Sequence, residues 1–146
     1  MSDRFFVDTN LLVYSRDASE PEKQQKAMKW MTRLWHDKSG RLSYQVLQEF
    51  YITVTHKLDP GLPTDIARMD VRSLMSWQPL SASATVMERA WTIQDRYGLS
   101  WWDALIVSAA QTAECSYLLT EDLQDKQDFG NVQVINPFHS TPEMFI

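Results

Sequence analysis

The chain is poor in residues that cross-link or interrupt small domains. It has one cysteine, Cys115, among 146 residues, which excludes an intrachain disulfide and a cysteine-rich zinc site. With four glycines and no repeat, low-complexity tract or linker, residues 1–146 are predicted to form one domain. No apolar run approaches the ~20 residues that cross a bilayer, and residues 1–4 lack the features of a secretion signal. We therefore expect a single cytoplasmic domain.

The charge is acidic overall and unevenly distributed. Fourteen Lys and Arg against nineteen Asp and Glu give a net charge of −5, which argues against a generic basic nucleic-acid coat protein. Residues 1–76 hold 11 basic and 10 acidic side chains, whereas residues 77–146 hold 3 and 9. An acidic total is still compatible with a nucleic-acid enzyme, because carboxylates that bind a metal ion add to the formal charge.

Short apolar runs alternate with amphipathic segments along the chain. We expect strands at 4–7, 41–44, 117–119 and 132–135, with a weak edge strand at 78–80. We expect helices at 11–14, 19–38 (capped by Ser19), 45–57, 64–77 (capped by Thr64), 83–97 (ended by Gly98) and 100–113. This alternation predicts an α/β fold with a mostly parallel sheet and helices on both faces. In such a sheet the ligand site lies at the carboxyl ends of the strands.

Four carboxylates stand where this sheet would present a ligand site. Asp8 follows the first strand and Asp122 follows the strand at 117–119, so both should point toward one rim. Glu49 lies near the start of the helix after the second strand, and Asp103 lies in the first turn of the helix that begins at residue 100. Convergent carboxylates repel one another, so they usually hold hard cations. Oxygen ligands alone favour Mg²⁺ or Mn²⁺ over zinc.

Each of these carboxylates also has a purely structural interpretation. Asp103 fits a capping box with Ser100, and Asp8 can cap the helix that follows it. Asp122 can sit in an ordinary acidic turn, and Glu49 on a solvated helix face. Spacing by itself leaves both interpretations open.

Four motifs, taken in order, resemble those of PIN domains. Residues 5–14 (FFVDTNLLVY) resemble the opening motif, and Glu49 within residues 43–50 matches the second acidic position. Residues 100–106 (SWWDALI) resemble the third motif and residues 118–124 (LLTEDLQ) the fourth. The order and intervals agree along residues 3–138. The short, single-domain form resembles the VapC-type ribonuclease toxins of bacterial toxin–antitoxin pairs.

The resemblance implies a three-layer α/β/α sandwich and a metal-dependent ribonuclease. Carried over position by position, it implies that Asp8, Glu49, Asp103 and Asp122 are catalytic and bind Mg²⁺ or Mn²⁺, with Thr9 supporting the metal shell. Water would attack phosphorus and leave a 5′-phosphate, without the RNA 2′-hydroxyl as nucleophile. The resemblance also implies an RNA substrate, a homodimer and a cognate antitoxin that occupies the active-site groove.

The fourth motif departs from the family pattern at one position. A glycine is expected soon after residues 122–124, and Lys126 stands there. The departure leaves open the backbone conformation of residues 123–130. It also leaves open whether Asp125 assists or replaces Asp122.

Other functions are weighed against this one. A haloacid-dehalogenase-type phosphatase needs a second Asp two residues after Asp8, where Asn10 stands, and the chain has no glycine-rich phosphate loop. A housekeeping PIN-domain ribonuclease without an antitoxin stays open, as does a non-catalytic PIN-fold module that binds RNA or protein.

Substrate contacts are open at the level of sequence as well. The basic residues Lys26, Lys29 and Arg33 share a helix face that either contacts RNA or is simply solvated. The pair Trp101 and Trp102 either stacks on bases or packs against protein.

Overall fold

Four of the five strands of the central sheet are parallel. The computed structural model describes residues 3–145, and its strand order is β2-β1-β3-β5-β4, with only β4 antiparallel to its neighbour. In chain order the elements are β1 (Phe5–Val7), α1 (Thr9–Tyr14), α2 (Pro21–Asp37), β2 (Gly40–Arg41), α3 (Tyr44–Ile52), α4 (Thr64–Leu74), α5 (Ala84–Tyr97), α6 (Trp101–Thr112), β3 (Tyr117–Leu119), β4 (Asp128–Phe129) and β5 (Val132–Ile135). A π-helical turn at Thr53–Lys57 continues α3, and 3₁₀ turns lie at Met75–Trp77 and Pro142–Phe145.

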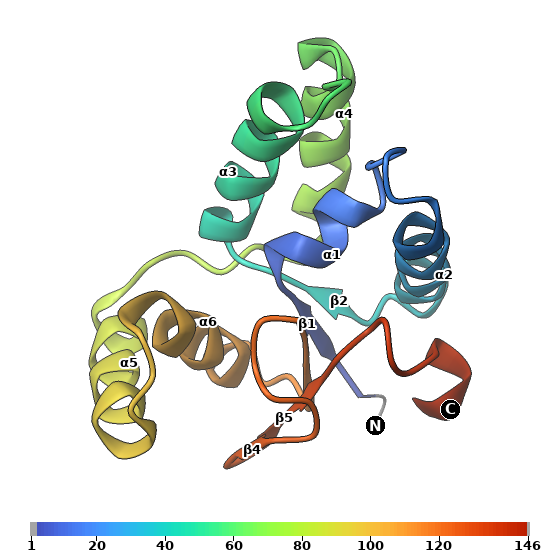
Figure 1. The fold of residues 1–146 in the computed structure, drawn as a ribbon. Coiled ribbons are helices and arrows are strands. Elements are labelled where there is room, and N and C mark those ends of the chain that lie inside the picture. The colour runs from blue at the N-terminus through green and yellow to red at the C-terminus, as the bar shows by residue number, and fades with distance from the viewer. Residues whose placement is uncertain (1–2, 146) are drawn as a thin grey trace.

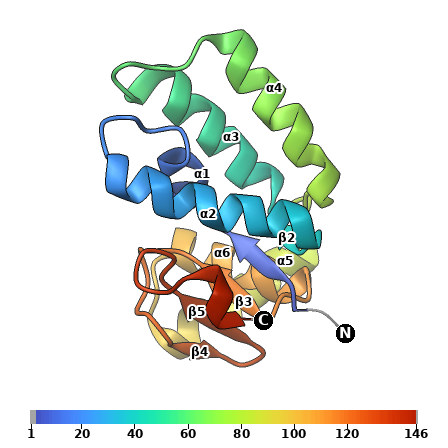
Figure 2. The same cartoon turned by 90° about the vertical axis from the view of Figure 1, so that its right-hand side faces the viewer.

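Helices cover the sheet on both sides. Figure 1 shows α5 and α6 on one side of the sheet and α2 on the other, with α1, α3 and α4 beyond the carboxyl end of β1. Helices α3 and α4 pack side by side, and α1 contacts both α2 and α3 (Figure 2). The inner strands β1, β3 and β5 are almost wholly apolar because the helices bury them on both faces. The predicted α/β/α architecture with a mostly parallel sheet is confirmed.

Several boundaries differ from the sequence-based expectation, and local capping explains two of them. The second strand ends at Arg41 instead of residue 44, because Ser43 caps α3 and its Oγ accepts a hydrogen bond from Val46 N at 3.2 Å. Ser19 does not cap α2, since its hydroxyl donates instead to Asp17 Oδ1 at 2.6 Å.

Three further expectations are corrected. Residues 78–80 form no strand, and Leu80 contributes only a single parallel bridge to Ser43. Thr64 is the first residue of α4, not its cap, which is Pro63. Strand β4 was not expected; it pairs with β5 across the two-residue turn Gly130–Asn131.

A close approach of two elements explains the glycine at the edge of the sheet. A Cβ at Gly40 would lie 2.6 Å from Cζ3 and 2.7 Å from Cη2 of Trp77. The Trp77 ring is 3% exposed and packs on Trp35 at a centroid distance of 5.0 Å, so it has little room to move. Glycine at position 40 therefore lets β2 contact the end of the α4 segment directly.

The backbone at Lys126 keeps the conformation for which a glycine was expected. Lys126 has φ of 70°, in the left-handed region, which costs a non-glycine residue roughly 1–2 kcal/mol. Its backbone N–H donates to Val134 O at 2.8 Å, which ties the loop to β5. The loop after the fourth motif therefore keeps a left-handed residue at position 126, at the cost of backbone strain in a lysine.

The one cysteine of the chain is buried in the core. Cys115 is 3% exposed, and burial raises the pKa of its thiol to about 12, so it is not a nucleophile at neutral pH. Within residues 3–145, no helix combines the length and the apolar character that a bilayer crossing requires.

Candidate active site

Asp8 and Thr120 leave the sheet side by side at the carboxyl ends of β1 and β3. Val7 pairs with Leu119, so the residues that follow are neighbours, and Asp8 N donates to Leu119 O at 3.1 Å. Thr120 Oγ1 donates to Asp8 Oδ2 at 2.8 Å, and Thr9 N donates to Asp8 Oδ1 at 2.7 Å. Asp8 therefore caps α1 and at the same time presents its carboxylate to the edge of the sheet.

Glu49 reaches this edge from α3. The hydroxyl of Thr9 donates to Glu49 Oε2 at 2.9 Å, and Gln45 Nε2 donates to the other carboxylate oxygen at 3.0 Å. The Ser43 cap sets where α3 begins, and so which of its faces carries Glu49. Thr9, expected to support the site, thus connects the Asp8 region to Glu49.

Asp122 joins the same network through an amide. Asn10 Nδ2 donates to Asp122 Oδ2 at 3.2 Å and to Thr120 Oγ1 at 3.1 Å. The backbone N–H of Asp122 donates to the same Thr120 hydroxyl at 3.1 Å. Three of the four expected carboxylates, those of Asp8, Glu49 and Asp122, are therefore linked by hydrogen bonds through shared polar neighbours.

Asp103 stands apart from that network. It lies in the first turn of α6, where its backbone N–H donates to Ser100 Oγ at 3.2 Å. Among the hydrogen bonds of residues 3–145, none joins its carboxylate to Asp8, Glu49 or Asp122. Ser100 therefore supplies one half of the expected capping box, and among residues 3–145 no hydrogen bond joins the Asp103 carboxylate to Ser100 N. The catalytic role of Asp103 stays a prediction.

Burial and nearby negative charge perturb Asp8. The pKa of its carboxyl group is raised from the ordinary 3.8 to about 6, mainly by burial and to a smaller extent by the charges of Asp122 and Glu49. The hydrogen bonds from Thr120 and from Thr9 N oppose the rise. Ionising Asp8 therefore costs free energy in the folded chain, and a positive charge at this edge of the sheet would offset that cost.

The donor chemistry of the site fits a hard divalent cation. The polar atoms it offers are mainly carboxylate oxygens, and the amide oxygen Oδ1 of Asn10 is buried without a hydrogen-bond partner among residues 3–145. As the side chains stand, no three Asp, Glu, His or Cys residues of that part of the chain converge closely enough to hold an ion. Thr9, Asn10 and Thr120 occupy the spaces between the carboxylates instead.

Sequence reasoning did not single out three residues of this network. Thr120, Asn10 and Gln45 hold the carboxylates, whereas the motifs indicate a role in the site only for the four acids and Thr9. A signal existed for Thr120: it is a polar residue directly after a buried strand and is fully buried. A polar side chain in that position needs a partner at the strand end.

Asp125 points away from the candidate site. Its Oδ1 accepts a hydrogen bond from Asn136 N at 2.8 Å, and its Oδ2 lies 3.9 Å from His139 Nδ1. These contacts tie the loop after β3 to the segment after β5. Asp122, not Asp125, has the hydrogen bond to Asn10.

Several basic side chains, Lys26 and Arg33 of the face considered for RNA binding among them, are engaged within the protein. Arg16 makes a two-pronged ion pair with Asp70 at 2.6 and 2.7 Å. Arg33 pairs with Asp37 at 2.8 Å, one turn along the same helix. Lys26 is engaged as well, since its ammonium group donates to Phe138 O at 3.3 Å.

The two tryptophans before Asp103 differ in exposure. Trp101 packs against Trp91, whereas Trp102 is 63% exposed. Of this pair, Trp102 alone presents most of its ring to solvent.

Comparison with known proteins identifies a family and several solved structures that this chain resembles. Residues 5–128 match the family model of the PIN domain, and no curated protein is significantly similar in sequence. Among solved structures, a toxin–antitoxin complex from Klebsiella pneumoniae is 20% identical, with 90% of this chain and 96% of that chain covered and a TM-score of 0.61. The sarcin–ricin-loop-cleaving toxin VapC20 of Mycobacterium tuberculosis is 18% identical, with 81% and 89% covered and a TM-score of 0.58. VapBC2 of Rickettsia felis, bound to a DNA fragment from its promoter, is 18% identical, with 89% and 96% covered and a TM-score of 0.58.

At these identities the solved structures show a shared fold, and the family match covers most of the chain. The α/β fold with its mostly parallel sheet agrees with that match. The chain belongs to the PIN domain family.

Proposed function

We propose that this chain is a divalent-metal-dependent endoribonuclease and the toxin of a VapBC-type toxin–antitoxin pair. The observation that carries the proposal is the hydrogen-bonded set of Asp8, Glu49 and Asp122 at the carboxyl edge of the sheet in a PIN-domain chain. The toxin part rests on the similar solved structures, which include toxin–antitoxin complexes. Mg²⁺ or Mn²⁺ is the proposed cofactor, and RNA the proposed substrate.

In this proposal Asp8, Glu49, Asp103 and Asp122 hold the metal ion. When bound, a divalent ion would neutralise charge on the reacting phosphate and lower the pKa of an attacking water. Asp8 lies deepest, and Thr120 and Thr9 N fix both of its oxygens. Asp122 is exposed and lies at the rim, where its free oxygen can orient the water for attack at phosphorus. Since these residues need no RNA 2′-hydroxyl as nucleophile, the products should carry 5′-phosphates.

Metal-dependent cleavage is the direct test of this proposal. A mixed panel of structured and single-stranded RNAs should be cut with Mg²⁺ or Mn²⁺, and EDTA should stop the reaction. The ends should be 5′-phosphates, since the proposed attack comes from water. Cleavage that persists in EDTA, or ends with 2′,3′-cyclic phosphates, would contradict the mechanism. A folded protein that cuts no RNA and binds no Mn²⁺ would favour a non-catalytic binding module.

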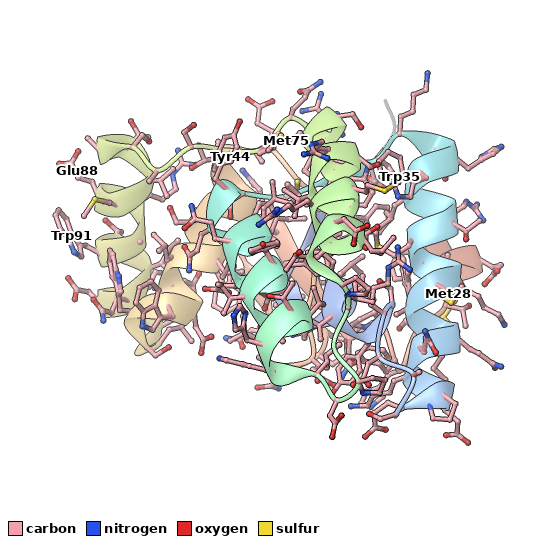
Figure 3. The ribbon with its side chains drawn as sticks, turned by 90° about the horizontal axis from the view of Figure 1, so that it is seen from above. Met28, Trp35, Tyr44, Met75, Glu88 and Trp91 are labelled. Carbon is pink, nitrogen blue, oxygen red and sulfur yellow. The ribbon has the colours of Figure 1, made fainter. Side chains whose placement is uncertain are left out.

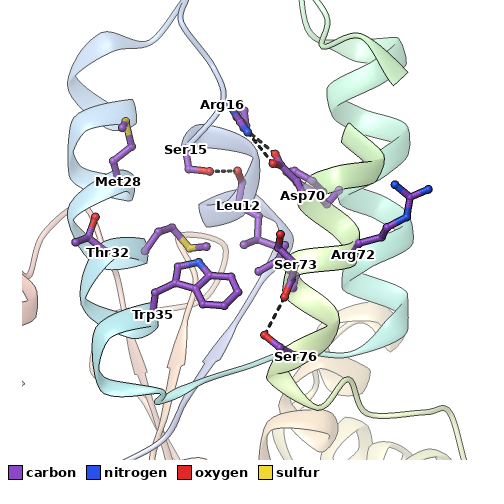
Figure 4. A pocket seen from close by; sticks show the side chains of 13 residues that line it. Leu12, Ser15, Arg16, Met28, Thr32, Trp35, Asp70, Arg72, Ser73 and Ser76 are labelled. Carbon is purple, nitrogen blue, oxygen red and sulfur yellow. Dashed lines mark hydrogen bonds and ion pairs between the residues drawn. The ribbon is translucent and has the colours of Figure 1, made fainter. Parts of the chain in front are cut away.

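A groove beside α1 supports the antitoxin part of the proposal. It has a volume of about 830 Å³ and lies between α2 and α4. Figure 4 shows Met28 and Trp35 of α2 facing it, with the Arg16–Asp70 ion pair at one end. Met28 and Trp35 are 51% and 40% exposed, so the groove presents apolar surface that a partner segment would bury. We assign this groove to the antitoxin, because α1, which begins after Asp8, also lines it.

A second apolar face supports the homodimer. Tyr44, Ile52 and Met75 are each between 41% and 48% exposed, and they border a hollow of about 470 Å³ between α3 and α4. In the view of Figure 3, Tyr44 and Met75 lie away from the groove side marked by Met28. We assign this α3–α4 face to a second copy of the chain.

Light scattering tests both assignments, and the two variants act as each other's control. The chain alone should have twice its 17.0 kDa mass, and Ile52→Lys should give the monomer, because a charge in the α3–α4 face opposes burial. Met28→Lys should leave the dimer intact and weaken the complex with a co-expressed cognate antitoxin by at least about tenfold. A monomeric chain, or an exchange of the two effects, would overturn the assignments.

A further inference from the structure

Asn10 bridges two strand ends that are far apart in sequence. It lies on α1, two residues after Asp8, and its side-chain nitrogen donates to Thr120 Oγ1 at 3.1 Å and to Asp122 Oδ2 at 3.2 Å. Asp122 is exposed, and within residues 3–145 this is the only hydrogen bond of its carboxylate. The orientation of that carboxylate therefore depends on Asn10.

The hydroxyl of Thr120 uses its full hydrogen-bonding capacity. A hydroxyl has one proton to donate and two lone pairs that accept. Asn10 Nδ2 and the backbone N–H of Asp122 both donate to it at 3.1 Å, so its own proton is directed to Asp8 Oδ2 at 2.8 Å. Asn10 thus also favours the contact between Thr120 and Asp8, which it does not itself touch.

The network admits one orientation of the Asn10 amide. The nitrogen faces two acceptors, and a flipped amide would place its oxygen against the carboxylate of Asp122. The oxygen is consequently turned elsewhere: it is buried and accepts no hydrogen bond from residues 3–145. Buried polar atoms without partners are rare in native proteins, so this orientation of the amide is kept by the two bonds of its nitrogen and not by its oxygen.

We propose that Asn10 is a positioning residue that fixes the separation and orientation of Asp8 and Asp122. It acts through the two hydrogens of its amide nitrogen, on Asp122 directly and on Asp8 through Thr120. This inference rests on the proposed function, because it assigns Asn10 a part in the same site. It gives a role to the residue at which the chain departs from the phosphatase pattern.

Binding of Mn²⁺ alone provides a readout that is independent of RNA cleavage. In Asn10→Ala, calorimetric titration should give a Kd for Mn²⁺ raised about 10–100-fold, the usual effect of losing a group that orients metal-binding side chains. The turnover number should fall by a similar factor while KM for RNA changes less than about threefold. The matched control is Asn131→Ala, an exposed asparagine in the turn between β4 and β5, which should change neither quantity.

A second variant separates hydrogen-bond donation from space filling. Asn10→Asp keeps the shape of the side chain but removes both donors and places a charge beside Asp122. If Asn10 only filled space, Asn10→Asp would cleave RNA like the wild type; the proposal expects a loss at least as large as in Asn10→Ala. Wild-type Mn²⁺ affinity in Asn10→Ala, or wild-type turnover in Asn10→Asp, would overturn the inference. Failure of the wild-type chain to cleave any RNA would instead count against the proposed function, and the Mn²⁺ titration would still decide the role of Asn10.

Discussion

Asp8→Asn should abolish RNA cleavage and make the folded chain more stable at neutral pH. Activity should fall by at least about 100-fold, because asparagine keeps the shape of Asp8 but removes the most buried negative charge of the candidate site. Stability should rise because burial makes the charge of Asp8 costly, and the nearby charges of Asp122 and Glu49 add to that cost. An enzyme that trades stability for function at its active site should behave in this way.

The stability difference has a defined pH dependence. Because burial raises the pKa of Asp8 from 3.8 to about 6, the folded chain binds this proton more tightly than the unfolded chain does. The stability that comes from protonated Asp8 is fully present below about pH 4 and is lost as the pH rises through 6. The full shift corresponds to about 3 kcal/mol at 1.36 kcal/mol per pKa unit, and since solvent reaches part of the residue we expect about 2 kcal/mol.

Urea unfolding of the two proteins in EDTA, at several pH values from 4 to 8, measures this difference. The advantage of Asp8→Asn should grow by about 2 kcal/mol across that range, and saturating Mg²⁺ should reduce it by stabilising only the wild type. Asp128→Asn, at an exposed position in β4, is the control and should follow the wild type at every pH. Stability curves of wild type and Asp8→Asn that stay parallel from pH 4 to 8 would show that Asp8 titrates normally.

Trp30→Ala should cause the largest loss of stability of any substitution considered for this chain. Trp30 is 1% exposed on α2, and its ring lies 5.7 Å from that of Phe5 and 5.8 Å from that of Phe145. Its indole nitrogen donates to Pro137 O at 2.9 Å and to Ser140 O at 3.1 Å. Removing the ring leaves a cavity and two buried carbonyls without this donor, so we expect a loss of about 3–5 kcal/mol in the free energy of unfolding.

Chemical denaturation of three variants resolves the causes of this loss. Trp30→Phe keeps an aromatic ring but removes the indole donor, and it should fall between wild type and Trp30→Ala. Trp102→Ala is the control, since its ring is 63% exposed; it should stay within about 0.5 kcal/mol of wild type. Equal losses in Trp30→Ala and Trp102→Ala would mean that α2 is not anchored to the C-terminal segment by Trp30.

Local sequence features account for most of the elements of this fold. The apolar runs at Phe5–Val7 and Tyr117–Leu119 are strands as predicted, and Ser100 and Gly98 cap the helices that they were expected to cap. The differences arise where a local signal is ambiguous or short. Ser43 continues the apolar run of a strand and also carries the signal of a helix cap. Strand β4 has only two residues, and the turn dipeptide Gly130–Asn131 is its one local signal.

The sequence also predicted that the acidic residues after strands lie at one edge of the sheet, because parallel strands end at a common edge. The motifs predicted that Asp8, Glu49 and Asp122 belong together, and the structure links them by hydrogen bonds. For Asp103 the sequence supported both a capping box with Ser100 and a catalytic role; the hydrogen bonds show Ser100 as the cap of α6, and the catalytic role of Asp103 stays a prediction.

What only the tertiary structure decided is which polar side chains hold those acids. Thr9 meets Glu49 across 40 residues of sequence, and Asn10 meets Asp122 across 112. Helix caps and apolar periodicity act over a few residues and can be read locally, whereas these contacts depend on the pairing of Val7 with Leu119 and on the packing of α3 against α1. The sequence by itself therefore determined the elements and the acidic character of the site, and the strand order and register determined that Asn10 and Thr120 connect its carboxylates.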